Sequence, residues 1–222
     1  ENRADKIVFQ TKGAQACYPP KVQKKSTVIL NPLDTSAFPT HDFSNEKKEI
    51  VSVGRLEPQK NQKLLIESFS MLAEELSDYN LVIYGEGSLR KELEVFIESK
   101  GLTNRVLLPG AKSGIQNYIK DASLFVLSSD YEGIPNALIE AMAIGLPCVS
   151  TDCSPGGARE LIENEKNGFI TPCGDAATLK KAMSKILTEK KVACQIGKRA
   201  QEVRKRTDRQ MSADRWLELI ES

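Results

Sequence analysis

Short apolar runs that alternate with helix-like stretches limit the possible folds of this chain more than any other feature of its sequence. The runs carry apolar residues without polar alternation, which is typical of strands buried on both faces. Six such runs lie at 50–54, 81–85, 106–110, 124–128, 148–151 and 168–171. The stretches between them have helical spacing, at about 61–76, 88–99, 114–121, 135–144 and 157–163. This repetition predicts right-handed βαβ units, so the expected fold class is α/β with a doubly wound parallel sheet.

The two ends of the chain differ from this repeat. Residues 1–33 hold two strand-like runs, KIVFQ and TVILN, and residues 34–49 are polar and contain proline, as in a linker or surface loop. Two strands bury too little surface to fold alone, so we expect residues 1–33 to be the remnant of an upstream domain of a longer protein. After residue 175 the pattern predicts C-terminal helices at 177–187, 192–206 and 208–220.

Composition excludes several functions. The 31 Lys and Arg residues against 30 Asp and Glu give a formal charge of +1, so we expect no nucleic-acid partner. The basic clusters at 190–191 and 204–206 are interpreted as solvated helix faces. His41 is the only histidine, which excludes a His-based zinc site, a Ser-His-Asp triad and a Cys-His dyad within the chain. The five cysteines have no C-x-x-C spacing, which favours free thiols in a reducing compartment.

The first of three polar loops that follow strand-like runs is GRLEPQKN, at 54–61. Because ligands of open parallel sheets bind outside the carboxyl ends of the strands, we expect the three loops to converge. Arg55 and Lys60 bring two cations to this loop, and such a pair suits a polyanion such as a diphosphate. The alternative is that both are solvated surface cations. The loop lacks the G-x-x-x-x-G-K-[ST] pattern of a Walker motif.

The second loop, GEGSL at 85–89, carries two glycines around one glutamate. Glycine permits a positive φ and a close approach of the backbone to a ligand, which makes Gly85 a candidate site residue. The G-x-G spacing alone is equally consistent with a plain tight turn.

The third loop belongs to the segment SSDYEGIPNALIEAMAIGLP at 128–147, which is the most informative part of the sequence. Pro135 is expected at the first position of a helix, where its missing N–H costs no helical hydrogen bond. The amides of Asn136 and Ala137 then point out of the helix start. Together with the helix dipole they form an anion site.

Two glutamates of this segment, Glu132 and Glu140, complete the pattern. Their carboxylates are expected roughly 8–12 Å apart, so that they reach different parts of one ligand. Carboxylates accept hydrogen bonds from hydroxyls, and a sugar nucleotide carries hydroxyls on both sides of a diphosphate. The alternative is that both glutamates are solvated.

The ordered segments VGRLEPQKN, VIYGEGSLR, VLLPG, EGIPNALIE and EAMAIGLPCVSTD resemble the C-terminal, donor-binding domain of the retaining glycosyltransferases of family GT4. EGIPNALIE has the E-x7-E motif of that family, and the resemblance covers about residues 27–187. It implies that the sheet is the Rossmann-like half of a GT-B fold. One departure is Asn31-Pro32, where many relatives have Asn-Gly, and it affects only the local turn.

The resemblance also implies a domain organisation. Residues 1–33 would be the last part of an acceptor domain and the crossover from it. Residues 34–206 would bind a nucleotide-sugar donor. Residues 207–222 would form a helix that packs back toward the missing N-terminal acceptor domain.

The resemblance further implies roles for the residues that match the family motifs. Arg55 and Lys60 would bind the donor diphosphate and stabilise the leaving group, and Glu132 would contact hydroxyls of the transferred sugar. These three are the expected catalytic residues, and Glu140 would hold the ribose hydroxyls. The other donor-binding residues would be Gly133, Ile134, Pro135 and Asn136 near the phosphate or sugar, and Gly85, Gly110, Ala111, Lys112 and Ser113 near the base.

The implied function is hexosyl transfer, with retention, from a nucleoside diphosphate sugar to a saccharide or lipid-linked acceptor in polysaccharide or glycan assembly. We expect a UDP-sugar donor, no cofactor, no metal, and no transfer by these residues alone. The expected location is cytoplasmic, with the complete enzyme at the inner membrane face. Alternatives are a sugar-nucleotide epimerase or a phosphorylase of the same architecture, or a non-catalytic nucleotide-sugar-binding module.

Overall fold

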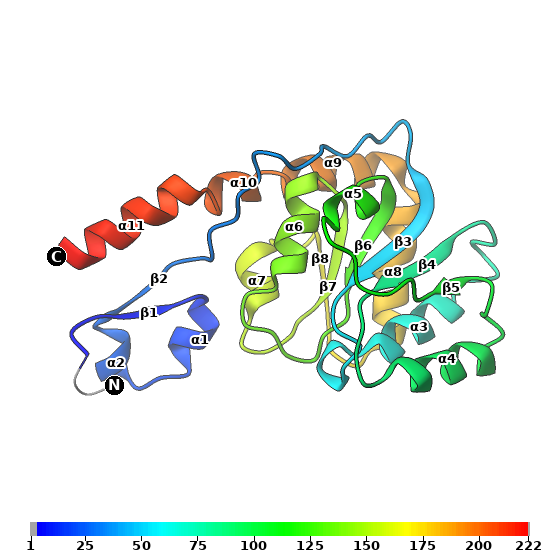
Figure 1. Cartoon of the computed structure of the whole chain (residues 1–222), viewed down its shortest axis with the longest axis horizontal. Coiled ribbons are helices and arrows are strands. Elements are labelled where there is room, and N and C mark those ends of the chain that lie inside the picture. Colours follow the sequence, from blue (N-terminus) through cyan, green and yellow to red (C-terminus); the bar gives the residue numbers. More distant parts are fainter. Residues whose placement is uncertain (1–3, 222) are drawn as a thin grey trace.

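The computed structural model describes residues 4–221 and contains two parallel sheets of different size (Figure 1). The larger sheet has six strands in the order β5-β4-β3-β6-β7-β8, and every neighbouring pair is parallel. This confirms the doubly wound sheet that the sequence predicts. Its strands are β3 (Lys47–Val53), β4 (Asn80–Tyr84), β5 (Val106–Leu107), β6 (Ala122–Leu127), β7 (Cys148–Thr151) and β8 (Phe169–Thr171).

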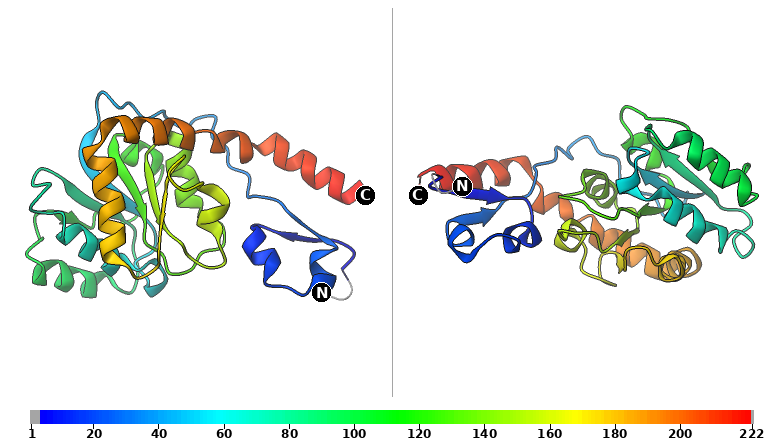
Figure 2. Two further views of the ribbon diagram at one scale, coloured as in Figure 1. Left: turned by 180° about the vertical axis from the view of Figure 1, so that it is seen from behind. Right: turned by 90° about the horizontal axis from the view of Figure 1, so that it is seen from below.

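Successive residues of the central strands face opposite sides of this sheet. Ile50 and Leu124 pack into one apolar cluster, whereas their neighbours Val51 and Phe125 pack into another. Burial on both faces explains why these strands lack polar alternation. Helices cover each face, as both views of Figure 2 show. The first cluster includes residues of α3 (Gln62–Ser70), α4 (Arg90–Ser99) and α8 (Ala176–Thr188), and the second includes residues of α5 (Gln116–Ile119), α6 (Asn136–Ile144) and α7 (Gly157–Leu161).

The direction of winding reverses in the middle of the sheet. The chain runs outward from β3 through β4 to β5, and β6 then returns to the free side of β3. Ligands of open α/β sheets bind outside the carboxyl ends of the strands at such a reversal. The loops after β3 and β6 are therefore the place to search for a site, and the loop after β3 contains the short 3-10 helix η1 (Pro58–Lys60).

A separate βαβ unit precedes the large sheet. β1 (Ile7–Phe9) pairs in parallel with β2 (Ser26–Val28), and α1 (Lys12–Ala16) and α2 (Pro20–Gln23) connect the two strands. This N-terminal unit lies beside the large sheet in Figure 1 and in both views of Figure 2. The last helix, α11 (Arg209–Glu221), extends from the large domain to the N-terminal unit, and its Arg215 lines a cavity together with Val28.

The predicted helix at 61–76 is wrong in its second half, because α3 ends at Ser70 and turns follow up to residue 78. Leu72 N donates to Phe69 O, three residues back instead of four, which tightens the chain. The Arg105 guanidinium then donates to Leu76 O and Tyr79 O, both at 2.8 Å. The apolar periodicity continues through this segment, so the sequence alone gives no sign of the break.

Three smaller expectations also differ from the structure. The helix predicted at 192–206 is two helices, α9 (Lys190–Ala200) and α10 (Val203–Arg206), separated by a turn. Pro135 is the N-cap of α6 and not its first residue, since its ψ of 98° is extended. The predicted linker at 34–49 ends early, because β3 begins at Lys47.

Candidate functional site

Backbone hydrogen bonds join the loops that follow β3, β4 and β5. Gly54 N donates to Tyr84 O at 3.0 Å, and Gly85 N donates to Gly110 O at 3.1 Å. Gly85 has a φ of 153°, and a Cβ at this position would lie 1.9 Å from Gly54 O. Only glycine fits there. The close approach predicted for Gly85 is thus made to the neighbouring loop, which fixes the edge of the site.

A second set of bonds holds η1 against the loop after β6. Asp130 N donates to Gln59 O at 2.9 Å, and Ser128 Oγ donates to Lys60 O at 2.9 Å. The Asn61 amide donates to Asp130 Oδ1 at 2.8 Å. These bonds bring the cation of the first loop to the glutamate of the third, so the predicted convergence of these loops is confirmed.

Glu132 is buried and held by three side chains. Lys60 Nζ forms an ion pair with Oε1, and Ser129 Oγ donates to the same oxygen at 2.7 Å. Gln59 Nε2 donates to Oε2 at 3.4 Å. Because the Glu132 side chain is only 9% exposed, it is not a solvated surface glutamate. Lys60 and Glu132 together form a neutral pair at the base of the site.

Glu140 lies on α6 and has fewer side-chain hydrogen-bond partners than Glu132. Gln116 Nε2 donates to its Oε2 at 3.2 Å. Burial raises the pKa of the Glu140 carboxyl above its usual range, and the hydrogen bond from Gln116 offsets part of that rise. The carboxylate is therefore costly to keep charged and gains from a partner that donates hydrogen bonds to it.

The start of α6 lies between these two glutamates in the chain. The first amides of the helix to donate within it belong to Leu138 and Ile139, and both donate to Pro135 O. The N–H groups of Asn136 and Ala137 have no intrahelical acceptor, as the first residues of any α-helix. These two N–H groups, at the start of a nine-residue helix, are able to bind an anion.

Two adjoining cavities make one continuous cleft, because both are lined by Val53, Gly54, Arg55 and Ala137. One is about 340 Å³ and is also lined by Gln59, Lys60, Glu132, Ile134, Pro135 and Asn136. The other is about 430 Å³ and is also lined by Tyr84, Gly85, Glu86, Ala111, Lys112, Ile115 and Glu140. The structure thus brings Arg55, Lys60, Glu132 and Glu140 to a single cleft, and Arg55 lines both of its parts.

Some predicted site residues do not line this cleft, and some lining residues were not predicted. Gly110, Ser113 and Gly133 lie outside both cavities. Gly110 instead supplies the carbonyl that Gly85 N contacts. The sequence analysis did not single out Val53, Tyr84, Ile115, Gln59 and Glu86, although the last two belong to loops that it identified. The apolar ones look like any buried strand or helix residue in the sequence.

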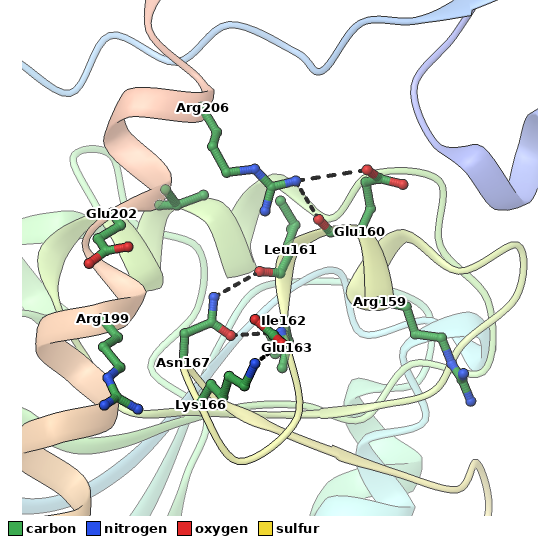
Figure 3. Close-up of a pocket in the computed structure, with 11 residues that line it drawn as sticks. Arg159, Glu160, Leu161, Ile162, Glu163, Lys166, Asn167, Arg199, Glu202 and Arg206 are labelled. Atoms are coloured by element: carbon green, nitrogen blue, oxygen red, sulfur yellow. Dashed lines mark hydrogen bonds and ion pairs between the residues drawn. The ribbon is translucent and has the colours of Figure 1, made fainter.

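A larger cavity of about 640 Å³ lies elsewhere, beside the loop that leads into β8 (Figure 3). This loop is at the amino ends of the parallel strands, whereas the candidate cleft is at their carboxyl ends. The charged side chains of this larger cavity are mostly paired with one another. Arg206 contacts Glu160, and Lys166 forms an ion pair with Glu163. None of the predicted site residues lines it.

Residues 4–221 contain neither a candidate metal site nor a candidate membrane-spanning helix. No group of three or more His, Cys, Asp or Glu side chains in this part of the chain could hold a metal ion. No helix within the same residues is long and apolar enough to cross a bilayer.

The sheet, its reversal and the cleft across it define a Rossmann-like ligand-binding domain. Residues 34–203 match the model of the family Glycosyl transferases group 1, and the chain belongs to this family. Its larger domain is accordingly one half of a GT-B fold, as the sequence predicts.

Two relatives whose names are those of glycosyltransferases support this assignment to the family. A Campylobacter jejuni protein named N-acetylgalactosamine-N,N'-diacetylbacillosaminyl-diphospho-undecaprenol 4-alpha-N-acetylgalactosaminyltransferase is 32% identical over 172 residues, which is 76% of this chain and 46% of the relative. The Escherichia coli UDP-Gal:alpha-D-GlcNAc-diphosphoundecaprenol alpha-1,3-galactosyltransferase is 32% identical over 180 residues, 75% of this chain and 46% of the relative. The chain spans about half the length of these relatives.

Among solved structures, a mutant of Staphylococcus aureus TarM, crystallised with Fondaparinux, alpha-GlcNAc-glycerol and UDP, superposes with a TM-score of 0.88 at 25% identity. That comparison covers all of this chain and 45% of TarM. HepE of Anabaena, in complex with UDP, superposes with a TM-score of 0.89 at 22% identity and covers 98% of this chain and 64% of HepE. The second likeness concerns the fold.

Proposed function

We propose that this chain is the donor-binding part of a glycosyltransferase that transfers a hexose, with retention, from a UDP-sugar to a saccharide or lipid-linked acceptor in glycan assembly. The observation that carries the proposal is the single cleft that Arg55, Lys60, Glu132 and Glu140 line. A cation between two carboxylates suits a ligand whose diphosphate stands between two groups of hydroxyls. The names of the two 32%-identical relatives, which include diphospho-undecaprenol substrates, support a lipid-linked acceptor.

In this proposal the nucleoside binds in the part of the cleft that is about 430 Å³ and that Glu140 lines. This part is lined mainly by apolar groups, including Val53, Ile115 and the Tyr84 ring, which suit a base. Glu140, at its edge, accepts hydrogen bonds from the ribose hydroxyls. Ala111 and Lys112 lie on the loop that would flank the base.

The diphosphate then lies across the middle of the cleft, near Arg55 and the first amides of α6. As the glycosidic bond breaks, negative charge grows on the leaving diphosphate. Arg55, Lys60 and the amides bind that state more strongly than the ground state, and this lowers the barrier. No protein nucleophile is required, and no metal is proposed.

Glu132 has two tasks in this proposal. Its carboxylate accepts hydroxyl hydrogen bonds from the transferred sugar, and it fixes Lys60 Nζ through their ion pair. A lysine held in this way does not lose side-chain freedom when the diphosphate binds. The arrangement differs from that of glycoside hydrolases, in which two carboxyl groups flank the bond that breaks.

The domain organisation is a proposal as well. We assign residues 1–33 to the acceptor domain and crossover, 34–206 to donor binding, and 207–222 to a helix that packs on the acceptor domain. In support, α11 and β2 line one cavity, and Trp216, Leu217 and Ile220 of α11 are exposed apolar side chains.

The first test is a thermal-shift panel of UDP, GDP and ADP on this chain. A ligand of the native state at about 100 times its Kd adds about 2.7 kcal/mol to the free energy of unfolding, so a specific nucleotide raises Tm clearly. UDP should give the largest rise, and equal, negligible shifts with all three would contradict nucleotide binding.

Product analysis of the complete protein with labelled UDP-sugar then separates the alternatives. A glycoside indicates transfer, an epimerised sugar nucleotide or a sugar phosphate indicates the other enzymes, and no turnover indicates a binding module.

A further inference from the structure

Gln10, in the N-terminal unit, lies near the start of α6, to which Asn31 links it. It follows β1 directly, at the carboxyl edge of the small sheet. A Cβ at Gly133 would have one heavy atom of the described residues within 4 Å, apart from its chain neighbours, and that atom is Gln10 Oε1 at 3.7 Å. The backbone next to Glu132 therefore lies close to the Gln10 side chain, and a Cβ at Gly133 would be in van der Waals contact with it.

Two asparagines continue from Gln10 to α6. Gln10 Nε2 donates to Asn31 Oδ1 at 2.6 Å, and Asn31 Nδ2 donates to Asn136 Oδ1 at 3.5 Å. The amide group of Gln10 is thus oriented, with its nitrogen held by Asn31. Its Oε1 accepts no hydrogen bond from any residue in the range 4–221, so this oxygen is available to a ligand.

The N-terminal unit is fixed against the large domain at this point, so the placement of Gln10 does not depend on one contact. Lys12 N donates to Glu160 Oε2 at 3.1 Å. The backbones also pack closely, since a Cβ at Gly13 would lie 1.7 Å from Pro155 O. Because Lys12 and Gly13 follow Gln10 closely in the chain, these contacts hold the end of β1 in place.

We propose that Gln10 is a specificity-determining residue that accepts a hydrogen bond, through Oε1, from a hydroxyl of the transferred sugar. This inference rests on the proposed function. Glu132 lines the proposed sugar end of the cleft, and Gln10 Oε1 lies beside Gly133, the next residue in the chain. A neutral amide oxygen suits a hydroxyl and does not repel the diphosphate. Gln10 contributes to the affinity for the sugar and not to the affinity for the nucleotide.

The experiment measures Kd values by calorimetry for UDP, UDP-glucose, UDP-galactose, UDP-GlcNAc and UDP-GalNAc. The readout is the ratio of the Kd for UDP to the Kd for the tightest UDP-sugar, in the unmodified chain and in two variants, Gln10→Ala and Gln10→Met. Methionine keeps the length of the side chain and removes its hydrogen-bonding groups. The control is Gln23→Ala, because Gln23 is a glutamine of the same unit whose Nε2 donates to Tyr18 O at 2.6 Å, within that unit.

Both Gln10 variants should lower this ratio by about 3- to 10-fold, the range for one hydrogen bond, and leave the Kd for UDP unchanged. Gln23→Ala should change neither quantity. An unchanged ratio in Gln10→Ala, or retention of the ratio by Gln10→Met, would overturn the role of the amide oxygen while leaving the proposed function intact. If the unmodified chain binds neither UDP nor any UDP-sugar, the proposed function fails and this inference fails with it.

Discussion

Lys60 Nζ and Glu132 Oε1 form an ion pair, although 72 residues separate them in the chain. Both side chains are mostly buried, whereas Arg55, which lines the same cleft, forms no ion pair within residues 4–221. The two cations that the sequence assigns to one diphosphate therefore differ in what they contribute to the fold. That difference can be measured separately from any activity.

Replacing Lys60 should destabilise the protein, and replacing Arg55 should not. Lys60→Met leaves the buried Glu132 carboxylate without its cation and should lower the free energy of unfolding by about 1–3 kcal/mol. Arg55→Ala leaves no buried charge unpaired and should change it by less than about 0.5 kcal/mol. Urea denaturation followed by circular dichroism gives both values.

The control is the double variant Lys60→Met/Glu132→Gln, which removes the unpaired charge and should recover part of the loss. Equal stabilities of the Lys60 and Arg55 single variants would mean that the ion pair contributes nothing to the fold.

Glu140 should make nucleotide binding sensitive to pH. Burial raises the pKa of its carboxyl, so Glu140 takes up a proton at a higher pH than an exposed glutamate. The protonated form accepts fewer hydrogen bonds from ribose, and UDP affinity should fall as the pH is lowered through this raised pKa. Glu140→Gln should weaken binding at neutral pH and remove this part of the pH dependence. Calorimetry over a pH series measures the affinity for UDP. Subtracting the pH curve of Glu140→Gln from that of the unmodified chain cancels the titration of UDP itself.

The same raised pKa predicts the effect of Glu140 on stability. An acid whose pKa is higher in the folded than in the unfolded state destabilises the fold at a pH above the folded pKa, and this cost disappears as the pH falls below the unfolded pKa. Glu140→Gln should therefore raise Tm at neutral pH, with a gain that shrinks toward acid pH. The exposed helical variant Glu98→Gln is the control and should show no such gain.

The parts of the fold that depend on local sequence were predictable. Runs such as the one in β6 are apolar on both faces because two clusters enclose them, and that property is visible in the sequence. The contact between Lys60 and Glu132 was not predictable, because it depends on η1 docking on the loop after β6 through Gln59 O. The end of α3 was missed for a similar reason, since Arg105, from another part of the chain, donates to the carbonyls of Leu76 and Tyr79 in the turns that follow the helix. Gln10 had no signal at all, because one polar residue after a short strand is common.

Gly85 should tolerate no side chain. In Gly85→Ala the Cβ would lie 1.9 Å from Gly54 O, and backbone shifts are needed to relieve the clash. We expect the free energy of unfolding to fall by more than about 1–3 kcal/mol, the usual cost of a strained backbone. UDP binding should also weaken, since Gly85 lines the part of the cleft proposed for the nucleoside. Chemical denaturation and calorimetry measure the two effects.

Gly101→Ala is the matched control for Gly85→Ala. Gly101 also has a positive φ, at 68°, but a Cβ there would contact nothing within 4 Å. It should show the cost of the backbone conformation without the clash and should leave UDP binding unchanged. If both alanine variants lose the same stability, the close approach to Gly54 is not what requires glycine at position 85.

Arg55 should matter for transfer far more than for stability. If its guanidinium stabilises the charge that grows on the leaving diphosphate, Arg55→Ala in the complete protein should cost about 2–4 kcal/mol in kcat/KM, which is roughly a 30- to 900-fold loss. Arg55→Lys keeps a charge but cannot contact two oxygens at once, so its kcat/KM should lie between those of Arg55→Ala and the unmodified protein. Arg199→Ala, in the remote cavity of Figure 3, removes an arginine from the same domain and should transfer sugar at the unmodified rate. Unmodified kcat/KM in Arg55→Ala would remove Arg55 from the diphosphate and, with it, the chemical reason for placing the donor in this cleft.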